Sequence, residues 1–293
     1  MKNKLLNLKG KLLSFENPVV MGILNVTPDS FFAGSRMEHE VALNSRIESI
    51  VSEGGAIIDI GGYSSRPGAD FVSQEDEWSR LEPALNMMAK KFPELPVSVD
   101  TFRADIAKRA VVAFGVSIIN DISGGSMDEN MFETVAALNV PYILTHLRKL
   151  SRSTQYDTVF GRPHSDVSYH DTNYDRIQEE VMVYFAEKLK TLRRLGVNDV
   201  ILDPGFGFGK TFDQNYELMR CLKNFSLFFA CPLLVGVSRK SMIYNLLNTT
   251  ADESLNGTTV LNTYSLLNGA DILRVHDVKA AVEAVKLVEK IKK

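Results

Sequence analysis

Eight short apolar segments alternate with longer amphipathic segments along the chain. The apolar segments are Val19–Leu24, Ala56–Ile60, Pro96–Val99, Val116–Ile119, Pro141–Leu144, Val200–Leu202, Leu233–Val237 and Ile272–Val275. Their apolar residues follow one another without strict alternation, which is typical of strands that are buried on both faces of a parallel sheet. Each segment therefore predicts one such strand.

Helical patterns separate these strands. The clearest spans residues 174–195, where apolar residues recur every three or four positions from Ile177 to Leu192 and Gly196 ends the pattern. Others lie near residues 39–53, 74–91, 103–114, 129–138, 213–223, 254–268 and 277–291. Eight strand–helix units in sequence predict an α/β fold, a (β/α)8 TIM barrel, and a doubly wound open sheet is the alternative.

Two segments fall outside this repeat. Residues 1–18 precede the first strand, and the stretch Leu8–Phe15 around Gly10 predicts a short β-hairpin under the barrel. Residues 148–172 form a long polar segment after the fifth strand, with Arg152, Arg162 and two histidines. Loops of this length inside compact domains are usually functional or disordered, so a surface insertion and an active-site lid are both open.

Composition limits the class of protein. The 293 residues are 45% hydrophobic and 24% charged, which is ordinary for a globular chain, and a barrel of roughly 250 residues is one domain. We therefore expect a single domain over residues 1–293. The net charge of −3 gives no electrostatic reason to expect nucleic acid or a membrane as a partner. No apolar run is long enough for a signal peptide or a membrane span, so we expect a cytoplasmic protein.

Polar residues follow every predicted strand. In strand order they are Asn25, residues 61–66, Asp100, Asn120 with Asp121, His146, Asp203, residues 238–240, and Arg274 with His276. A single Asp before a turn is usually a turn former, but eight such endings converge on one face of a barrel. Barrels of this kind carry their active sites at the C-terminal ends of the strands, so the sequence predicts an active site there.

The mixture of charges at these positions suggests the ligand. Four side chains could bind an anion, and they are Arg66, Lys240, Arg274 and His276. Asp100 and Asp203 suit a ligand with several N–H donors, and the Asn120 amide can read an edge that mixes donors and acceptors. The pattern predicts a nitrogen heterocycle that carries a phosphate or pyrophosphate.

A glycine-rich segment, residues 205–211, resembles a phosphate-binding P-loop at first sight. That motif requires a glycine five residues before Gly209, and position 204 is proline. We interpret the segment as a loop whose glycines let the backbone approach a flat ligand. Phe206 or Phe208 either flanks that ligand or packs on the barrel.

Seven motifs, in order along almost the whole chain, resemble those of the dihydropteroate synthases. They span residues 21–31 (MGILNVTPDSF), 59–69 (DIGGYSSRPGA), 98–101 (SVDT), 119–125 (INDISGG), 203–211 (DPGFGFGKT), 237–241 (VSRKS) and 274–277 (RVHD). The resemblance implies a transferase of folate biosynthesis. Its substrates would be 6-hydroxymethyl-7,8-dihydropterin pyrophosphate and p-aminobenzoate, and its products 7,8-dihydropteroate and pyrophosphate. It also implies a Mg²⁺ requirement, a homodimer and a target of sulfonamides.

The resemblance also assigns roles by matching position. The pterin would be held by Asp100, Asn120, Asp203 and Lys240. The pyrophosphate would be held by Asn25, Arg66, Arg274 and His276, with Asn25 reaching the Mg²⁺. The p-aminobenzoate site would comprise Ser65, Pro67, Phe208, Ser238 and Lys240. Asp100, Asp203, Lys240, Arg274 and His276 are the implied catalytic residues.

Two departures from the family pattern keep alternatives open. Ala33 stands where the family usually has an acid, and the fifth strand ends in Thr145-His146-Leu147 in place of Met-His-Met. A pterin-binding homologue with impaired catalysis is one alternative. A pterin-dependent methyltransferase component is another, but it would have no need of Arg66, Arg274 and His276 together.

Overall fold

The computed structural model describes residues 4–27, 36–63, 71–147 and 176–292. Predictions for Ala33, Ser65, Arg66, Pro67 and residues 148–172 lie outside these described residues. No described helix is long and apolar enough to cross a membrane.

Eight parallel strands form a ring. They are β3 (Val19–Asn25), β4 (Ile57–Gly61), β5 (Val97–Asp100), β6 (Ile118–Asp121), β7 (Tyr142–Thr145), β8 (Val200–Asp203), β9 (Leu234–Val235) and β10 (Ile272–Val275). The strand order in the sheet is β8-β7-β6-β5-β4-β3-β10-β9. One isolated parallel bridge joins Leu202 of β8 to Leu233, the residue just before β9. The Leu202 amide also donates to the Pro232 carbonyl at 2.9 Å. The predicted barrel is confirmed, and the open-sheet alternative is wrong.

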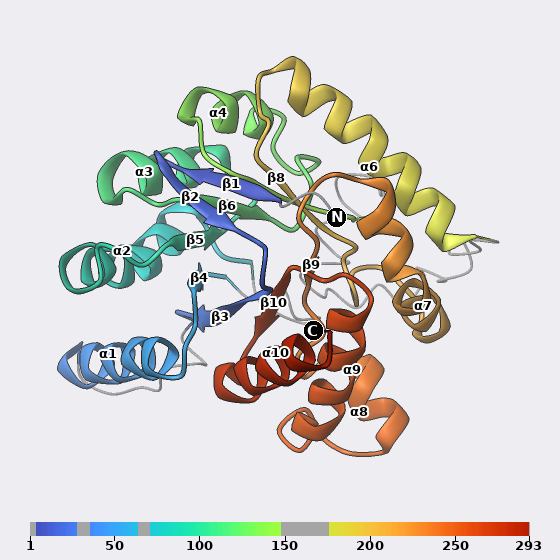
Figure 1. The fold of residues 1–293 in the computed structure, drawn as a ribbon. Coiled ribbons are helices and arrows are strands. Elements are labelled where there is room, and N and C mark those ends of the chain that lie inside the picture. The colour runs from blue at the N-terminus through green and yellow to red at the C-terminus, as the bar shows by residue number, and fades with distance from the viewer. Residues whose placement is uncertain (1–3, 28–35, 64–70, 148–175, 293) are drawn as a thin grey trace.

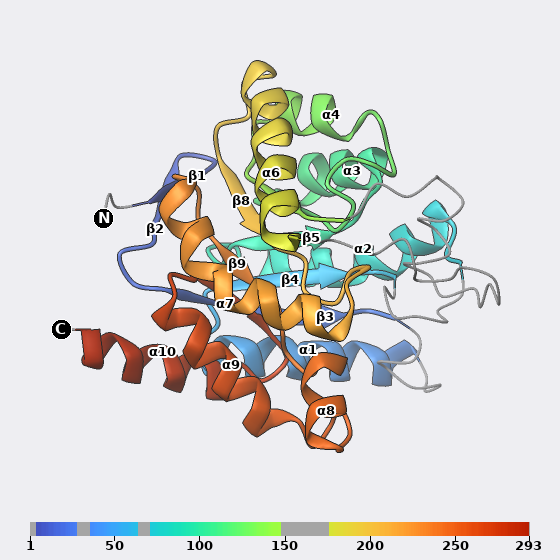
Figure 2. The same ribbon diagram turned by 90° about the vertical axis from the view of Figure 1, so that its right-hand side faces the viewer.

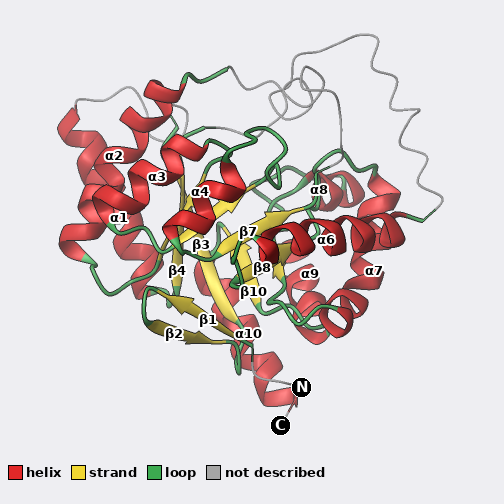
Figure 3. Cartoon of the chain, turned by 90° about the horizontal axis from the view of Figure 1, so that it is seen from above, coloured by secondary structure: helices red, strands yellow, loops and turns green. Residues whose placement is uncertain are grey.

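Helices surround the ring of strands (Figure 1). They are α1 (Arg36–Ser52), α2 (Gln74–Lys91), α3 (Ala104–Phe114), α4 (Met131–Leu138), α6 (Ile177–Arg194), α7 (Phe212–Phe228), α8 (Ser241–Leu247), α9 (Leu255–Leu267) and α10 (Val278–Lys292). Seen from above, they form the outer layer around the strands (Figure 3). Sequence periodicity did not predict α8, because in its seven residues only Met242 and Ile243 are buried.

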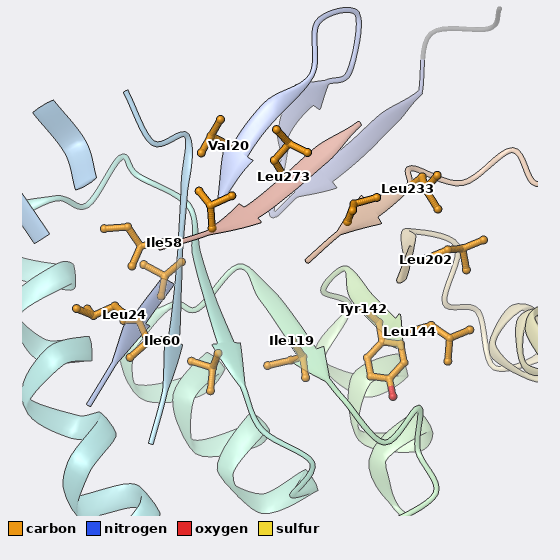
Figure 4. Close-up of a cluster of buried hydrophobic side chains, with 14 of the residues drawn as sticks. Val20, Leu24, Ile58, Ile60, Ile119, Tyr142, Leu144, Leu202, Leu233 and Leu273 are labelled. Carbon is orange, nitrogen blue, oxygen red and sulfur yellow. The ribbon is translucent and has the colours of Figure 1, made fainter. Parts of the chain in front are cut away.

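Outward-facing strand residues pack against these helices. Figure 4 shows this layer, which includes Val20, Ile58, Ile119 and Leu202, all buried. Side chains of a strand alternate between its two faces, so the neighbouring residues point into the barrel. Parallel strands with both faces covered read as continuous apolar runs, which is why the sequence showed no alternation.

The inward-facing residues at the N-terminal ends of the strands form a second apolar cluster, here called the barrel floor. Its members are Met21, Ile57, Ile118, Ile143, Ile201, Leu234 and Ile272, each fully buried. The predicted hairpin is confirmed as β1 (Leu5–Leu8) and β2 (Lys11–Ser14), and its Leu6, Leu8 and Phe15 pack against the floor. Figure 2 shows the hairpin at one end of the barrel.

The hairpin turn follows from two residues. Lys9 and Gly10 have φ angles of 51° and 93°, as a two-residue type I′ turn requires. The Gly10 amide also donates to the Asn7 side-chain oxygen at 2.7 Å. The local sequence therefore closes the hairpin, and its buried face closes the barrel below.

Candidate active site

Most inward-facing residues beyond the floor are polar, and with the loops that follow they form the opposite end of the barrel, here called the barrel rim. It comprises Asn25, Asp59, Asp100, Asn120, Asp203, Ser238, Lys240, Arg274 and His276. In the sheet register Asp100 lies beside both Gly61 and Asn120. The fold thus brings to one end of the barrel the predicted site residues that the structure describes.

Arg274 joins two carboxylates across the rim. Its Nε donates to Asp59 Oδ2 at 2.6 Å, and its Nη2 donates to Asp100 Oδ2 at 2.7 Å. Asn120 Nδ2 donates to the same Asp59 oxygen at 2.9 Å. Although burial opposes the charge, the two carboxylates raise the pKa of Arg274 above its ordinary value. The guanidinium is therefore a permanent cation inside the barrel mouth.

Burial disfavours the charged form of the Asp100 carboxylate. Burial raises its pKa from 3.8 to about 7; Arg274 opposes that rise, and the charge of Asp59 adds to it. The Tyr63 hydroxyl donates to Asp100 Oδ1 at a long 3.4 Å. A ligand that offers N–H donors would favour the ionised form of this carboxylate.

Asp203 and Lys240 supply a second pair of opposite charges. Asp203 Oδ1 accepts the Gly205 amide at 2.8 Å, and burial raises the pKa of Asp203, with Lys240 opposing the rise. Lys240 Nζ donates to the Phe206 carbonyl and lies 4.5 Å from the centroid of the Phe208 ring. Burial lowers the pKa of Lys240 to about 8. A carboxylate, an ammonium and an aromatic face thus lie together at the end of β8.

The loop after β8 is held by Lys210. Its Nζ donates to the carbonyls of His146, Gly205 and Phe208 at 3.2, 2.7 and 3.2 Å. Burial lowers the pKa of Lys210 to about 7. Gly205 has a φ of 70°, and a Cβ there would lie 2.2 Å from the His146 carbonyl oxygen, so only glycine fits. The lysine that suggested a P-loop instead fixes this loop against the end of β7.

The two phenylalanines of this loop differ. Phe206 is fully buried in the outer core, so of the two alternatives for this residue the packing one holds. Phe208 is partly buried and packs against a small cluster that includes Tyr63 and Phe102. Only Phe208 therefore remains as a candidate to contact a flat ligand.

Arg239 ties the loop after β9 to the end of β10. Its Nε and Nη2 donate to the two oxygens of Asp277 at 2.9 and 2.7 Å, and its φ is 56°. On one side of Arg239, Ser238 Oγ accepts the His276 amide at 3.2 Å. On the other side lies Lys240. The Arg239–Asp277 contact therefore fixes the positions of Ser238, Lys240 and His276 relative to one another.

Asn25 lies at the end of β3, facing Gly61 and Asp100. A Cβ on Gly61 would lie 3.7 Å from Asn25 Oδ1 and 3.8 Å from Asp100 Oδ2, so these two oxygen atoms both lie close to Gly61. The described residues contain no group of three or more His, Cys, Asp and Glu side chains placed to hold a metal. An amide oxygen such as Asn25 Oδ1 fits Mg²⁺, which usually binds through one or two protein oxygens together with substrate phosphates and water.

The sequence analysis did not identify two residues of the site, and it did not decide whether a third faces into the barrel. Asp59 and Lys210 were not identified as site residues, although a carboxylate inside an apolar strand was a signal. Asp121, listed with Asn120 at the end of one strand, faces outward. Its carboxylate accepts from the Ser123 amide and hydroxyl, the Gly125 amide and the Tyr142 hydroxyl, so it shapes the loop.

Comparisons with known proteins show which family this chain resembles in sequence and fold. The family model of pterin binding enzymes matches residues 21–276. The dihydropteroate synthase of Escherichia coli K12 is 38% identical over 283 residues, which cover 96% of this chain and 94% of that protein. The Yersinia pestis dihydropteroate synthase in a sulfonamide drug complex has a TM-score of 0.85 and 35% identity, covering 98% and 99% of the two chains. The Xanthomonas albilineans dihydropteroate synthase with 4-aminobenzoic acid has a TM-score of 0.86 and 32% identity, covering 99% of each chain.

Proposed function

This chain belongs to the dihydropteroate synthases among the pterin-binding enzymes, and from that membership we propose the chemistry of its barrel rim. It is a transferase of folate biosynthesis. Its reaction joins 6-hydroxymethyl-7,8-dihydropterin pyrophosphate to p-aminobenzoate and releases 7,8-dihydropteroate and pyrophosphate.

The observation that carries this function is the arrangement of four charged side chains at the barrel rim, Asp100, Asp203, Lys240 and Arg274. Two largely buried carboxylates with raised pKa values suit the N–H donors of a pterin ring, and the Lys240 ammonium can donate to its acceptors. Asn120 adds an amide on the neighbouring strand. We place the pterin among these four side chains, Asp100, Asn120, Asp203 and Lys240.

The pyrophosphate would lie toward the cationic side of the rim. Arg274 and His276 stand at the end of β10, and Arg66 joins them in our proposal from outside the described residues. Asn25 would hold Mg²⁺, whose charge would stabilise the departing pyrophosphate. We expect a chelator to abolish turnover and added Mg²⁺ to restore it.

Charge separation is the step that these residues assist. The C–O bond to pyrophosphate breaks, and a delocalised cation forms on the pterin methylene. Asp100 and Asp203 stabilise that cation, while Arg274 and His276 stabilise the anion, which is preorganised electrostatic catalysis at both ends of one bond. The arylamine nitrogen then attacks the methylene and loses a proton, so positioning matters more than a strong base.

We place p-aminobenzoate beside Ser238, Phe208 and Lys240. Ser65 and Pro67 complete the site in this proposal, although they lie outside the described residues. Lys240 already lies over the Phe208 ring. The carboxylate and the ring of p-aminobenzoate could therefore meet a cation and an aromatic face at the same place. We expect a sulfonamide to compete with p-aminobenzoate at this position.

We also propose a homodimer, supported by the reversed polarity of α9. Besides Leu266, this helix buries three polar residues, Thr258, Asn262 and Ser265, and it exposes Val260 and Tyr264, which are 58% and 37% exposed. Neighbouring Leu246 and Leu247 of α8 are about half exposed. Exposed apolar residues gathered on two neighbouring helices commonly mark a protein interface. Sedimentation should show a dimer that Val260→Asp disrupts, whereas the exposed Val112→Asp on α3 should leave it intact.

A turnover assay with both substrates and Mg²⁺ tests the activity. We expect dihydropteroate from the wild-type chain and a loss of roughly 10²–10³-fold in kcat/KM for Arg274→Ala, the scale of removing one group that stabilises transition-state charge. Lys11→Ala, an exposed change on the hairpin, is the control. Pterin binding without turnover would favour the impaired homologue. Wild-type turnover in Arg274→Ala would remove the anion site from our assignment.

A further inference from the structure

Asp59 lies where the inward face of the barrel changes from apolar to polar. It occupies the middle of β4 between Ile58 and Ile60, its side chain is fully buried, and its register neighbours are Ile23 and Ser98. A carboxylate removed from water is costly unless it is paired, and an apolar side chain would serve packing equally well. Packing alone therefore does not account for Asp59.

One oxygen of Asp59 holds two side chains from strands that do not pair with β4. Its Oδ2 accepts Arg274 Nε from β10 at 2.6 Å and Asn120 Nδ2 from β6 at 2.9 Å. In the strand order, β3 lies between β4 and β10, and β5 lies between β4 and β6. A single buried atom thus sets the relative position of two residues across five strands.

The contact constrains each partner in a specific way. The guanidinium of Arg274 is planar, so fixing Nε at Asp59 and Nη2 at Asp100 sets the orientation of the whole group. The Asn120 amide must turn its nitrogen toward Asp59, which leaves its oxygen and one remaining N–H for a ligand. Asp100 is partly exposed at the rim, whereas Asp59 is inaccessible, so a ligand can compete for the first contact only.

We propose that Asp59 is a positioning residue that holds Arg274 and Asn120 in register for the pterin pyrophosphate. It does not touch the substrate. This inference rests on the proposed function, because it assigns to Arg274 the pyrophosphate and to Asn120 the pterin ring. Losing Asp59 should impair both catalysis and pterin binding.

Two substitutions separate position from charge. In Asp59→Asn the amide oxygen can take the place of Oδ2 and keep both hydrogen bonds, while the amide nitrogen replaces Oδ1, which has no partner among the described residues. Asp59→Ala removes both bonds. We expect kcat/KM to fall about 10–100-fold for Asp59→Ala, as when a group that orients an active-site ligand is removed, and by less for Asp59→Asn.

Asp271 provides a matched control at the other end of β10. Its Oδ2 also accepts two donors, Lys4 Nζ at 2.6 Å and the Leu233 amide at 2.7 Å. Asp271→Asn and Asp271→Ala should lower the melting temperature while kcat/KM of the folded protein stays within about twofold of wild type, since effects at distant sites are usually independent.

A double-mutant cycle supplies the decisive readout. If Asp59 acts through Arg274, the double variant Asp59→Ala with Arg274→Ala should lose less than the product of the two single losses. Full multiplication of the losses would overturn the inference, as would folded Asp59→Asn and Asp59→Ala variants with wild-type kcat/KM. If Asp59→Ala does not fold, Asp59→Asn combined with Arg274→Ala completes the cycle.

Calorimetry with a pterin that lacks pyrophosphate separates this inference from the proposed function. If the wild-type chain binds pterin without turnover, the proposed function fails. The pterin affinity of the variants still reports whether Asp59 positions Asn120. Weaker pterin binding in the Asp59 variants than in the Asp271 variants then supports the inference. Equal binding in both sets overturns it.

Discussion

The floor and the rim of this barrel are built on the same strands, two residues apart. Ile57 is followed on the inward face by Asp59, and Ile118 by Asn120. The floor residues are apolar and buried, whereas the rim holds carboxylates and cations whose pKa values are displaced by burial. Two positions along a strand thus separate residues that stabilise the fold from residues that lower its stability and bind the ligand.

The largest effect should come from the floor. Ile143→Ala removes a fully buried side chain from the barrel interior and should lower the free energy of unfolding by about 2–5 kcal/mol. The kcat/KM of the folded protein should not change. Chemical denaturation and steady-state kinetics measure the two effects. The exposed Val112→Ala should shift stability by less than about 0.5 kcal/mol. A kinetic defect in Ile143→Ala would mean that floor and rim are not independent.

The opposite result is expected at the rim. Asp203→Asn should weaken binding of a pterin by about 1.5–3 kcal/mol, the usual value of a charged hydrogen bond, with little loss of stability. Its amide oxygen can still accept the Gly205 amide, so the loop should keep its shape. Asp121→Asn, on an outward-facing carboxylate, should instead lower stability and leave calorimetric pterin affinity unchanged. If the two variants exchange these phenotypes, our inward and outward assignments are wrong.

A pH dependence should come from Asp100. Its pKa is about 7 in the folded protein and 3.8 for an ordinary aspartate, mainly because it is buried. Between these values the folded protein keeps a proton that the unfolded chain has lost, so this group lowers stability as pH rises, by up to about 1.4 kcal/mol per pH unit. Asp100→Asn lacks this group, and its stability relative to wild type should therefore rise from about pH 4 to pH 7. Denaturation curves across that range test it, and a constant difference would contradict it.

The smallest effect should come from the exterior of the floor. Lys11 on the hairpin pairs with Glu94, and both side chains are mostly exposed. Such pairs contribute between about 0 and 1 kcal/mol and weaken with salt. Lys11→Ala should therefore change thermal stability little, whereas Phe15→Ala on the same hairpin removes a buried ring. A loss from Lys11→Ala as large as that from Phe15→Ala would show that charge holds the hairpin in place.

Strand positions were predictable from the sequence because long-range burial leaves a local signature. The run Ile272–Val275 matches β10 at both ends, and the ends of the other seven runs lie within two residues of the ends of their strands. What apolar continuity cannot reveal is which face a residue occupies. Asn120 and Asp121 are adjacent and both polar, and only the register places the first inside the barrel and the second outside.

The same limit explains the residues that were missed. Asp59 lies inside a segment that reads as apolar, and its partners are 61 and 215 residues away along the chain. Lys210 was judged against a phosphate-binding motif, whereas its partners are backbone carbonyls that only the folded loop brings together. Contacts between residues far apart in sequence have no periodic signature that a single chain could display.

A single bridge joins β8 to Leu233, the residue before the short strand β9, so the two strands are weakly paired at this point, here called the seam. Hydrogen exchange should be faster for the amides around Leu233 and Leu234 than for those of β4, which is paired on both sides. Asp203 ends one strand of this seam, and Lys240 follows the other. A ligand that bridges these two residues should therefore slow hydrogen exchange at the seam most.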